Sequence, residues 1–454
     1  MKRVALHNLG CKVNAYELDV MRQMLQEEGY KIVPFDEPAD IYIVNTCTVT
    51  NIADRKSRQM LHKARKQNRE AVVVAVGCYV QTGKDACEDE SIDLAIGNHQ
   101  KNELIPILET FLQNRENGCG HTEAERVSIL DPERPAPYEE MTLRVSPEHT
   151  RAFLKIQDGC NQFCSYCIIP YVRGRVRSRR PEAVCREAMA LADTGCREIV
   201  LTGIHLSSYG MDLVEKRSGE GPGETAYKEE CLLRLIEKLH EIKGIERIRL
   251  GSLEPRIVTE RFAERLSGLA KVCPHFHLSL QSGCDATLKR MHRQYLAGEY
   301  YEKVCILRSV YTDPAITTDV IVGFPGETEE EFGQTEAFLE RVGFYEMHVF
   351  KYSRRQGTIA AGMPGQISDV VKARRSEALL ELDRRQSRMY RERLMGQEKA
   401  VLFEEPAVFD GRQYMLGHTM EYVKAALPSE ENLSNRILNR KITGFLQENI
   451  VLLQ

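Results

Sequence analysis

The sequence predicts an α/β protein with three parts: an N-terminal doubly wound parallel sheet, a central partial (β/α)6 barrel and a small C-terminal antiparallel β-barrel. Short apolar runs alternate with helical stretches in the first 114 residues, and the same alternation resumes at Phe153. After Gly396 the pattern changes to short strands separated by Gly and Pro. Alternation of strands and helices favours parallel sheets, whereas closely spaced strands favour a small barrel.

Changes in composition divide the chain into four segments. Asn114 to Pro147 is rich in Gly, Pro, Glu and Arg, which predicts an irregular linker. Val370–Arg393 is highly charged and is expected to form a helix. We therefore expect an N-terminal domain (1–114), a linker (115–145), a barrel core (146–376), and a helical lead-in followed by the C-terminal β-barrel (377–454).

Three apolar runs in the N-terminal domain predict buried parallel strands: Val4–Leu6, Ile41–Val44 and Val72–Val76. A cysteine follows each of them, namely Cys11, Cys47 and Cys78. Open α/β sheets bind ligands at the carboxyl ends of their strands. A single buried cysteine would be unremarkable, since free Cys is often buried. Three at corresponding strand ends favour a metal cluster.

The remaining strands are expected in two groups. Six apolar segments separated by helices predict the partial barrel: Phe153–Ile156, Glu198–Leu201, Arg247–Leu250, His275–Leu280, Ala315–Val322 and Glu346–Val349. Four later segments predict the C-terminal β-barrel: Lys399–Glu404, Tyr414–Thr419, Met420–Ala426 and Asn449–Leu453.

The spacing Cys160-x3-Cys164-x2-Cys167 places three thiols on one short loop. Thiolates bind iron–sulfur clusters and zinc. Zinc sites usually use separated ligand pairs and a fourth Cys or His, whereas the next cysteine, Cys185, stands alone. A four-iron cluster with three protein ligands keeps one iron open for a substrate. The loop therefore favours such a cluster.

Composition indicates a cytoplasmic protein with no membrane partner. The fourteen cysteines lack the dense pairing of a secreted disulfide scaffold, and the N-terminus lacks an apolar signal core. Apolar runs such as Ala71–Val76 are far too short to span a bilayer. The net charge of -4 gives no global indication of a nucleic-acid partner.

Two three-cysteine sites, a partial barrel and a small β-barrel together resemble the radical S-adenosylmethionine (SAM) methylthiotransferases, over essentially the whole chain. Other stretches are similar to motifs of that family: Leu201–His205, His277–Gly283, Asp319–Thr328 and Phe350–Thr358. The resemblance implies a [4Fe-4S] cluster on Cys11, Cys47 and Cys78 for sulfur transfer. It implies a second, SAM-binding [4Fe-4S] cluster on Cys160, Cys164 and Cys167. It also implies an RNA-binding TRAM domain at the C-terminus.

The resemblance further implies how the cofactors are used. The second cluster would reduce SAM to generate a radical, so an electron-donor protein and a sulfur source are expected as partners. Thr202 and Gly203 are the expected SAM contacts at the end of the second barrel strand, where glycine permits close approach. Ser252 and Gln281 lie near later strand ends, although ordinary strand-end polar residues are nearly as good an interpretation.

Local charge suggests contact with RNA. Five arginines occur in eight residues just after the cluster loop, without interspersed acids: Arg173, Arg175, Arg177, Arg179 and Arg180. A charge run is usually a solvated face, but its position beside the cluster favours phosphate contact. The adenine would be read in the tRNA anticodon loop, because sequence-specific RNA recognition favours exposed bases.

The stretches around the first two cysteines separate three branches of the family. Asn8–Glu17, Asn45–Thr50 and Ala53–Gln59 are similar to the branch that modifies N6-threonylcarbamoyladenosine (t6A). That resemblance implies addition of a methylthio group to C2 of t6A at position 37 of tRNA. Alternatives are the branches acting on isopentenyladenosine in tRNA or on a ribosomal protein, and a non-catalytic iron–sulfur protein that binds RNA.

Overall fold

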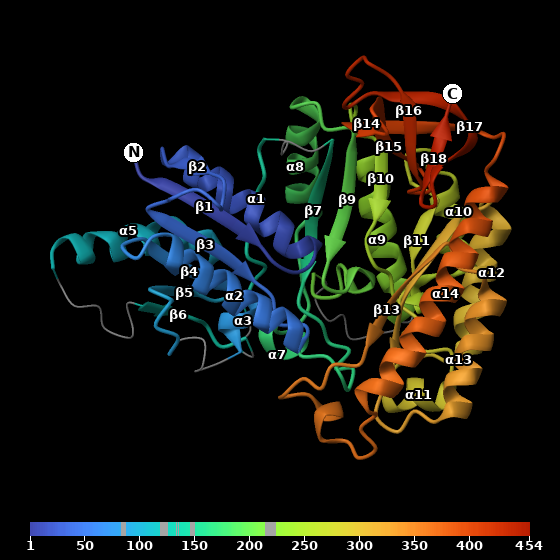
Figure 1. Cartoon of the computed structure of the whole chain (residues 1–454), viewed down its shortest axis with the longest axis horizontal. Coiled ribbons are helices and arrows are strands. Elements are labelled where there is room, and N and C mark those ends of the chain that lie inside the picture. Colours follow the sequence, from blue (N-terminus) through green and yellow to red (C-terminus); the bar gives the residue numbers. More distant parts are fainter. Residues whose placement is uncertain (83–87, 119–125, 133, 135, 146–149, 214–223) are drawn as a thin grey trace.

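The computed structural model describes residues 1–82, 88–118, 126–132, 134, 136–145, 150–213 and 224–454, with side chains of 224–228 left undescribed. The chain forms the three predicted parts. In Figure 1 the N-terminal sheet is blue to cyan, the central barrel green to orange and the C-terminal barrel red. Among the described residues, no helix combines the length and apolar character needed to cross a membrane.

The N-terminal domain is a parallel sheet in the order β2-β1-β3-β4-β5-β6. Helices α1 and α5 cover one face and α2 and α3 the other, so the doubly wound prediction is confirmed. Strand β6 falls within 115–145, so that segment adds a strand to the sheet. The elements are β1 (Arg3–Asn8), α1 (Lys12–Glu27), β2 (Lys31–Val33), β3 (Ile41–Thr46), α2 (Asn51–Gln67), β4 (Val72–Gly77), α3 (Cys78–Gln81), β5 (Leu94–Ile96), η1 (Lys101–Glu103), α5 (Leu104–Glu116) and β6 (Val127–Ser128).

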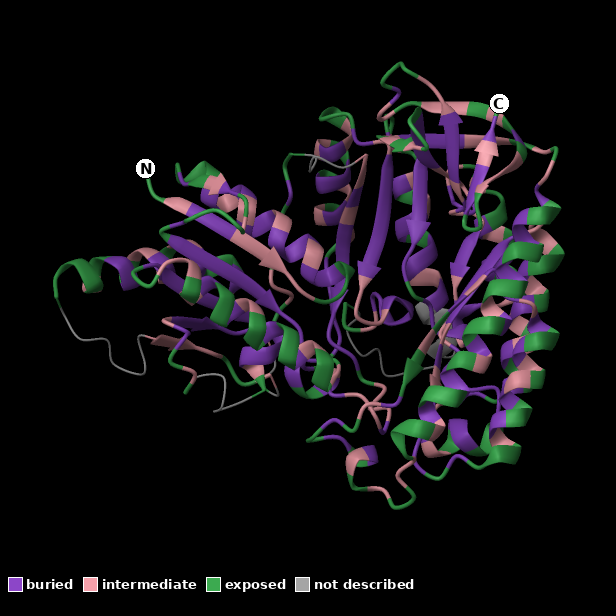
Figure 2. Ribbon diagram, viewed as in Figure 1, coloured by how far each residue is buried: buried purple, intermediate pink, exposed green. Residues whose placement is uncertain are grey.

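The central domain contains the six predicted parallel strands. Together with the short antiparallel strand β8 they form two sheets, β10-β9-β7-β8 and β11-β12-β13, which are joined by isolated bridges from Ile248 to Val272 and from Leu253 to Leu278. The strands are β7 (Arg151–Asp158), β8 (Arg177–Ser178), β9 (Glu198–Gly203), β10 (Arg247–Leu250), β11 (His275–His277), β12 (Ala315–Val322) and β13 (Glu346–Lys351). Strands β7 to β12 are largely buried and β13 is partly exposed, whereas the outer helices alternate buried and exposed faces (Figure 2).

The helices of the central domain connect and cover these strands. They are α7 (Ile169–Arg173), α8 (Pro181–Asp193), η2 (Leu206–Ser208), α9 (Glu224–His240), η3 (Pro255–Ile257), α10 (Glu260–Ser267), α11 (Asp285–Arg290), α12 (Ala297–Val310), α13 (Glu329–Val342), η4 (Ile359–Gly362) and α14 (Asp369–Arg393). The charged stretch Val370–Arg393 is therefore helical, as predicted, and lies against β13.

The C-terminal domain is a closed barrel in the order β14-β15-β16-β18-β17. Its strands are β14 (Glu398–Phe409), β15 (Arg412–Thr419), β16 (Lys424–Pro428), β17 (Ile437–Gln447) and β18 (Ile450–Leu453). The prediction missed β17, in which only Ile442 is buried. It also extended a strand over Met420–Tyr422, where the chain turns and Tyr422 adopts a left-handed φ of 70°.

That turn closes one end of the central barrel. The Tyr422 ring lies under the guanidinium groups of Arg151 and Arg249, at 5.0 and 4.6 Å. Arg247 donates hydrogen bonds to the carbonyls of His418 and Ala400, at 2.9 and 2.7 Å. In Figure 1 strands β9 and β10 point away from the C-terminal barrel, so the carboxyl ends of the strands remain free for a site.

Candidate metal centres

The first cysteine loop leaves the carboxyl end of β7. Gly159 has a φ of +69°, and a Cβ there would lie 1.9 Å from the carbonyl oxygen of Arg175, so only glycine fits this turn. Cys160 donates its N–H to the Gly174 carbonyl at 3.0 Å, and Cys167 donates to the Cys164 carbonyl at 3.0 Å. These bonds fold the loop so that all three thiols line one cavity.

That cavity has a volume of about 150 Å³ and lies at the carboxyl ends of the strands. Ser252 and Gln281, two of the predicted SAM contacts, line it. Gln281 has a left-handed φ of 73° and donates its N–H to the Asp319 carbonyl at 2.9 Å. A non-glycine residue held in this conformation beside a cavity is typical of functional sites.

The other two predicted SAM contacts lie just behind the cavity wall. Thr202 is buried, and a Cβ on Gly203 would lie 2.8 Å from Gln157 Oε1. Gly203 therefore permits close packing against β7. The next two residues, Ile204 and His205, line the cavity.

Arg293 belongs to the same cavity and was missed by the sequence analysis. Its Nη1 donates to Cys164 Sγ at 3.4 Å and its Nη2 to the Ser279 carbonyl at 3.2 Å. The residue follows α11 and lies far from the cysteine loop in the sequence, so no local pattern identifies it. Its positive charge stabilises the thiolate form of Cys164, which is the form that binds a metal.

The thiols of this loop fit a soft metal centre with an open position. Burial raises the pKa of Cys160 to about 11 and that of Cys167 to about 12, and the neighbouring thiolates add to this effect. Metal binding must therefore displace protons from these sulfurs. Three thiols on one loop, with a cavity beside them, suit an iron–sulfur cluster that also binds a small molecule.

The second triplet assembles at the carboxyl edge of the N-terminal sheet. Cys11 precedes α1, Cys47 follows β3 and Cys78 begins α3. Gly10 has a φ of +114°, and a Cβ there would lie 3.2 Å from Cys47 Sγ, so the first two loops touch. Burial raises the pKa of Cys47 to about 11, and the charges of Cys78 and Cys11 raise it further. The structure thus brings the three strand-end thiols together.

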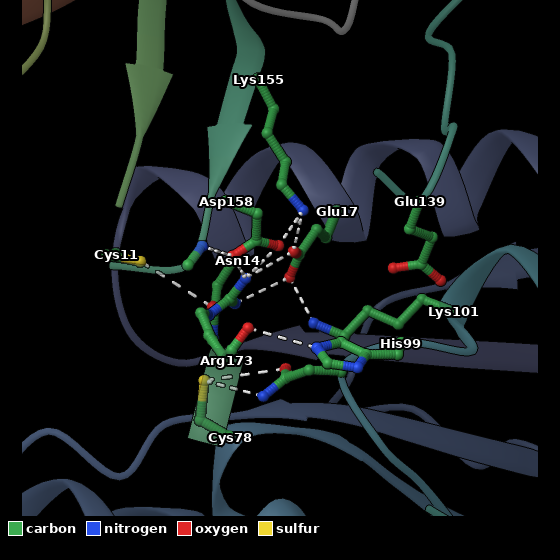
Figure 3. A network of polar contacts seen from close by, with 12 residues as sticks. Cys11, Asn14, Glu17, Cys78, His99, Lys101, Glu139, Lys155, Asp158 and Arg173 are labelled. Carbon is green, nitrogen blue, oxygen red and sulfur yellow. Dashed lines mark hydrogen bonds and ion pairs between the residues drawn. The ribbon is translucent and has the colours of Figure 1, made fainter. Parts of the chain in front are cut away.

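A network of buried charges lies behind this second triplet (Figure 3). Arg173, from the central domain, donates to Glu17 Oε1 at 2.9 Å and to Asp158 Oδ1 at 3.1 Å. Lys155 Nζ lies 2.7 Å from carboxylate oxygens of both acids, and Lys101 also pairs with Glu17. These side chains are 0–4% exposed, so the two domains share one dry ionic core.

The arginine run is therefore only partly a surface feature. Arg173, Arg177 and Arg179 are buried, and Arg179 pairs with Glu187 and Glu140. Their acidic partners Glu17, Asp158, Glu140 and Glu187 lie outside the run, which is why the run looked free of acids in the sequence. The prediction that all five arginines contact RNA is corrected, and Arg175 and Arg180 are the exposed members.

The interior of the central barrel is polar beside the cavity. Phe276, Ile316 and Val320 pack into the core, so the alternating residues of their strands face the barrel interior. Those residues include His277 and Asp319, and the exposed His348 lies beside Asp319 on the neighbouring strand β13. His277 Nε2 lies 3.3 Å from Asp319 Oδ2, and the two imidazole rings stack at 5.7 Å.

Lys12, next to Cys11, is exposed to solvent, yet it is near enough to charged residues of this interior to interact with them. Desolvation by the surrounding protein lowers the pKa of Lys12, as do the charges of Arg249 and Arg151, whereas Asp319 opposes this effect. The ligand atoms of His277, Asp319 and His348 lie within 4.8 Å of one another and could hold a metal ion. The surrounding cations disfavour that use, because a metal ion would add positive charge. The group therefore suits a polar organic ligand better.

Comparisons with known proteins agree with this architecture. Residues 3–97 match the uncharacterized protein family UPF0004, and residues 154–339 match the radical SAM superfamily. The structure resembles a radical S-adenosylmethionine methyltransferase, TsrM, from Kitasatospora setae. The TM-score is 0.53 at 17% identity, over 77% of this chain and 73% of that one. This likeness concerns the fold alone.

Full-length relatives are more similar in sequence. The threonylcarbamoyladenosine tRNA methylthiotransferases MtaB of Bacillus subtilis and Aquifex aeolicus are 37% and 38% identical, over 97% and 89% of this chain and 94% and 93% of theirs. A tRNA-2-methylthio-N(6)-dimethylallyladenosine synthase of Moorella thermoacetica is 35% identical, over 96% of this chain and 94% of its own length. With both cysteine sites in place, the chain belongs to the radical SAM methylthiotransferase family.

Proposed function

We propose that this enzyme adds a methylthio group to C2 of t6A at position 37 of tRNA. The relatives above include enzymes for threonylcarbamoyladenosine and for dimethylallyladenosine, at nearly equal identity. Their names support methylthiolation of a tRNA adenosine. The choice between the two adenosine substituents then depends on the residues that face the substrate.

The polar side chains of the barrel interior favour t6A over dimethylallyladenosine as the substrate. The threonylcarbamoyl group presents a carboxylate, a hydroxyl and a urea, whereas the dimethylallyl group is a hydrocarbon. Lys12, which follows Cys11, and the His277–Asp319 pair, whose Asp319 carbonyl accepts a hydrogen bond from Gln281 of the SAM cavity, offer charged and hydrogen-bonding partners. A hydrocarbon placed against these groups would desolvate them without replacing their hydrogen bonds, which disfavours it strongly.

The residues of the chain hold the reactants, and the cofactors supply the difficult chemistry. The C2–H bond of adenine is neither acidic nor attached to a good electrophile, so two bound [4Fe-4S] clusters and SAM supply the radical and sulfur chemistry. Cys160, Cys164 and Cys167 would hold the SAM-binding cluster, and Cys11, Cys47 and Cys78 the other. Ser252 and Gln281 line the space beside Cys160, Cys164 and Cys167, where SAM would bind.

The partners follow from the same proposal. A base in the anticodon loop is accessible, and Arg175 and Arg180 provide exposed charge for its phosphates. The C-terminal TRAM barrel would bind a further part of the tRNA. The reaction also needs an electron-donor protein and a sulfur source, and we place it in the cytoplasm, where the tRNA is.

Mass spectrometry of tRNA nucleosides from a deletion strain tests the proposal. Loss of 2-methylthio-t6A with accumulation of t6A is expected, and an unchanged amount would refute the t6A assignment. Purified enzyme should modify a stem–loop carrying t6A in preference to one carrying isopentenyladenosine or a ribosomal protein. Reconstitution with SAM and dithionite that yields no 5′-deoxyadenosine would favour a non-catalytic role.

The Lys12→Gln variant tests the observation behind the substrate choice. We expect its KM for the t6A stem–loop to rise about tenfold or more, because a charged hydrogen bond contributes roughly 1.5–3 kcal/mol. SAM cleavage without substrate should remain, since Lys12 is not on the SAM cavity. Lys31→Gln, an exposed lysine on β2, is the matched control.

A further inference from the structure

Arg173 belongs to the central domain, and its side chain contacts the N-terminal domain. It ends α7, which directly follows the SAM-binding cysteine loop, yet its side chain is fully buried against the N-terminal domain. Besides Glu17 and Asp158, its Nη2 donates to Asn14 Oδ1 at 2.8 Å. Its Nε–H is buried without a hydrogen-bond partner among the described residues. One side chain of the central domain thus completes the wall behind the N-terminal cysteines.

The positive charge of Arg173 interacts with all three N-terminal thiols. Figure 3 shows it between Cys11 and Cys78. Its positive charge lowers the pKa of Cys11 and of Cys47, against the larger opposite effect of burial. The charge of Cys78 in turn raises the pKa of Arg173. The arginine is therefore the cation that these sulfurs share.

Hydrogen bonds link the same residue to the loops that carry the thiols. Asn14, which Arg173 holds, lies 3.8 Å from Cys11 Sγ and donates to the carbonyl of Thr46 at 3.0 Å, next to Cys47. On the other side Asn98 Nδ2 lies 3.6 Å from Cys78 Sγ and donates to the Val172 carbonyl at 2.9 Å. The position of α7 is thereby coupled to the geometry of the triplet.

The buried core behind the triplet has an excess of positive charge. Four buried cations (Lys101, Lys155, Arg173 and Arg177) face two buried anions (Glu17 and Asp158), each at most 7% exposed, and the half-buried Glu139 lies near Lys155 and Lys101. Four positive and three negative charges leave an excess of one. Unbalanced buried charge is costly unless an opposite charge lies near it. Three thiolates on a metal cluster supply that charge at the place where Arg173 ends.

We propose that Arg173 is a positioning residue for the N-terminal [4Fe-4S] cluster: its guanidinium fixes the thiol-bearing loops, offsets the charge of the thiolate-bound cluster and thereby raises its reduction potential. Net charge and hydrogen bonds to sulfur are the main protein controls on such potentials. The inference rests on the N-terminal cluster of the proposed function and goes beyond it, because it makes that cluster dependent on contact with the other domain.

Redox titration of a chain that holds only this cluster provides the test. In a Cys160→Ala, Cys164→Ala, Cys167→Ala background, iron and sulfide analysis first establishes that the N-terminal cluster assembles. Arg173→Gln should then make reduction at least tenfold less favourable, a shift of about 59 mV to more negative potential for one electron. Arg173→Lys, which keeps the charge, should shift the potential less.

Two further variants separate charge from structure. The double variant Arg173→Gln, Glu17→Gln removes one charge of each sign, so its potential should return toward the wild-type value. Arg179→Gln is the matched control, because Arg179 is equally buried on the same segment but pairs with Glu187. It should leave the potential unchanged even where it lowers the thermal midpoint.

Three outcomes would overturn the inference while the cluster itself stands. The first is full iron content with an unchanged reduction potential in Arg173→Gln. The second is a shift of the reduction potential in Arg179→Gln as large as that in Arg173→Gln. The third is equal loss of iron in Arg173→Gln, Arg173→Lys and the double variant, which would show a purely structural role. If the background binds no iron before Arg173 is changed, the N-terminal cluster of the proposed function fails, and this inference fails with it.

Discussion

The two cysteine triplets differ in how the chain builds them. Cys160, Cys164 and Cys167 share one loop that opens onto a cavity, whereas Cys11, Cys47 and Cys78 come from three loops at the edge of a sheet. The contiguous site draws its arginine, Arg293, from its own domain, and the distributed site draws Arg173 from the other domain. A contiguous loop can be complete within one domain, whereas the distributed site depends on the docking of two.

The open and the enclosed site also suit different tasks. The first has space beside its thiols for a cofactor, and Arg293 lies on the cavity wall. The second has Cys47 and Cys78 buried, with an ionic core behind them and only Cys11 exposed. We therefore expect changes at the first site to affect SAM cleavage and changes at the second to affect sulfur transfer.

The largest expected effects come from removing one thiol of each triplet. Cys160→Ala should abolish SAM cleavage, because a cluster on two remaining loop thiols loses the geometry that binds SAM. Cys11→Ala should leave some uncoupled cleavage, measured as 5′-deoxyadenosine, but no methylthio product. Cys305→Ala, an exposed thiol on α12, is the control and should retain both activities. Equal loss of cleavage in both triplet variants would show that the two sites are not separable.

Arg293→Leu should reduce SAM cleavage by about 10- to 100-fold. The variant loses a charge-assisted hydrogen bond to Cys164 Sγ, and such bonds contribute roughly 1.5–3 kcal/mol. Arg293→Lys should recover part of the rate, since it keeps the charge beside the thiolate. The production of 5′-deoxyadenosine measures both.

Arg290→Leu is the matched control for Arg293. Arg290 lies three positions earlier and pairs with Glu331 rather than with a cysteine. It should keep the cleavage rate near that of the wild type. A loss in Arg290→Leu as large as that in Arg293→Leu would assign the effect to the fold of this segment.

The same contrast explains what the sequence could predict. The contiguous triplet is visible as spacing, and the distributed triplet only because each cysteine follows a recognisable apolar strand. Arg173 looked like one of five surface arginines, since its partners Glu17 and Asp158 precede it by 156 and 15 positions. Long-range ion pairs leave no local pattern, so the ionic core between the domains could not be predicted.

Prediction of the fold failed where burial is sparse. Strand β17 contains Asn439, Arg440 and Lys441 and buries only Ile442, so its alternation is hard to recognise. Strand β6 has two residues, pairs with β5 and packs only the half-buried Val127 against the core. By contrast β3 and β4 are buried throughout, and their continuous apolar runs predicted them correctly.

Acid should weaken the enclosed site through His99. Burial lowers the pKa of His99 to about 4, with the charge of Arg177 acting in the same direction, and its Nε2 lies 3.2 Å from the Arg173 carbonyl. Because the folded pKa lies below the usual 6.5, the unfolded chain binds the proton more tightly. The contribution of His99 to the free energy of unfolding is therefore fully present above pH 6.5. It is lost as the pH falls toward 4, which lowers the free energy of unfolding by about 1–3 kcal/mol.

Thermal midpoints at pH 7 and pH 5 measure this loss. The wild type should lose more stability between the two than His99→Gln, which cannot take up the proton. His62→Gln removes a histidine whose side chain is 55% exposed in the same domain and is the control. An identical pH dependence in the wild type and His99→Gln would show that the docking contact is insensitive to this histidine.

The smallest expected effects belong to Arg175 and Arg180, the exposed members of the arginine run. Arg175 packs over the Phe163 ring of the SAM-binding loop at 4.6 Å, while its charge stays exposed. Each of Arg175→Gln and Arg180→Gln should weaken tRNA binding by a few-fold. If each contacts one phosphate in a single-stranded loop, the slope of log K against log salt should fall by about 0.7.

Binding isotherms at several salt concentrations distinguish this contact from general charge. Arg234→Gln removes an arginine whose side chain is 72% exposed on α9, and its slope should match that of the wild type. An equal change in Arg234→Gln would mean that only overall charge attracts the RNA. A change confined to Arg175 and Arg180 would place the phosphates beside the open site, because Arg175 packs on Phe163 of its cysteine loop.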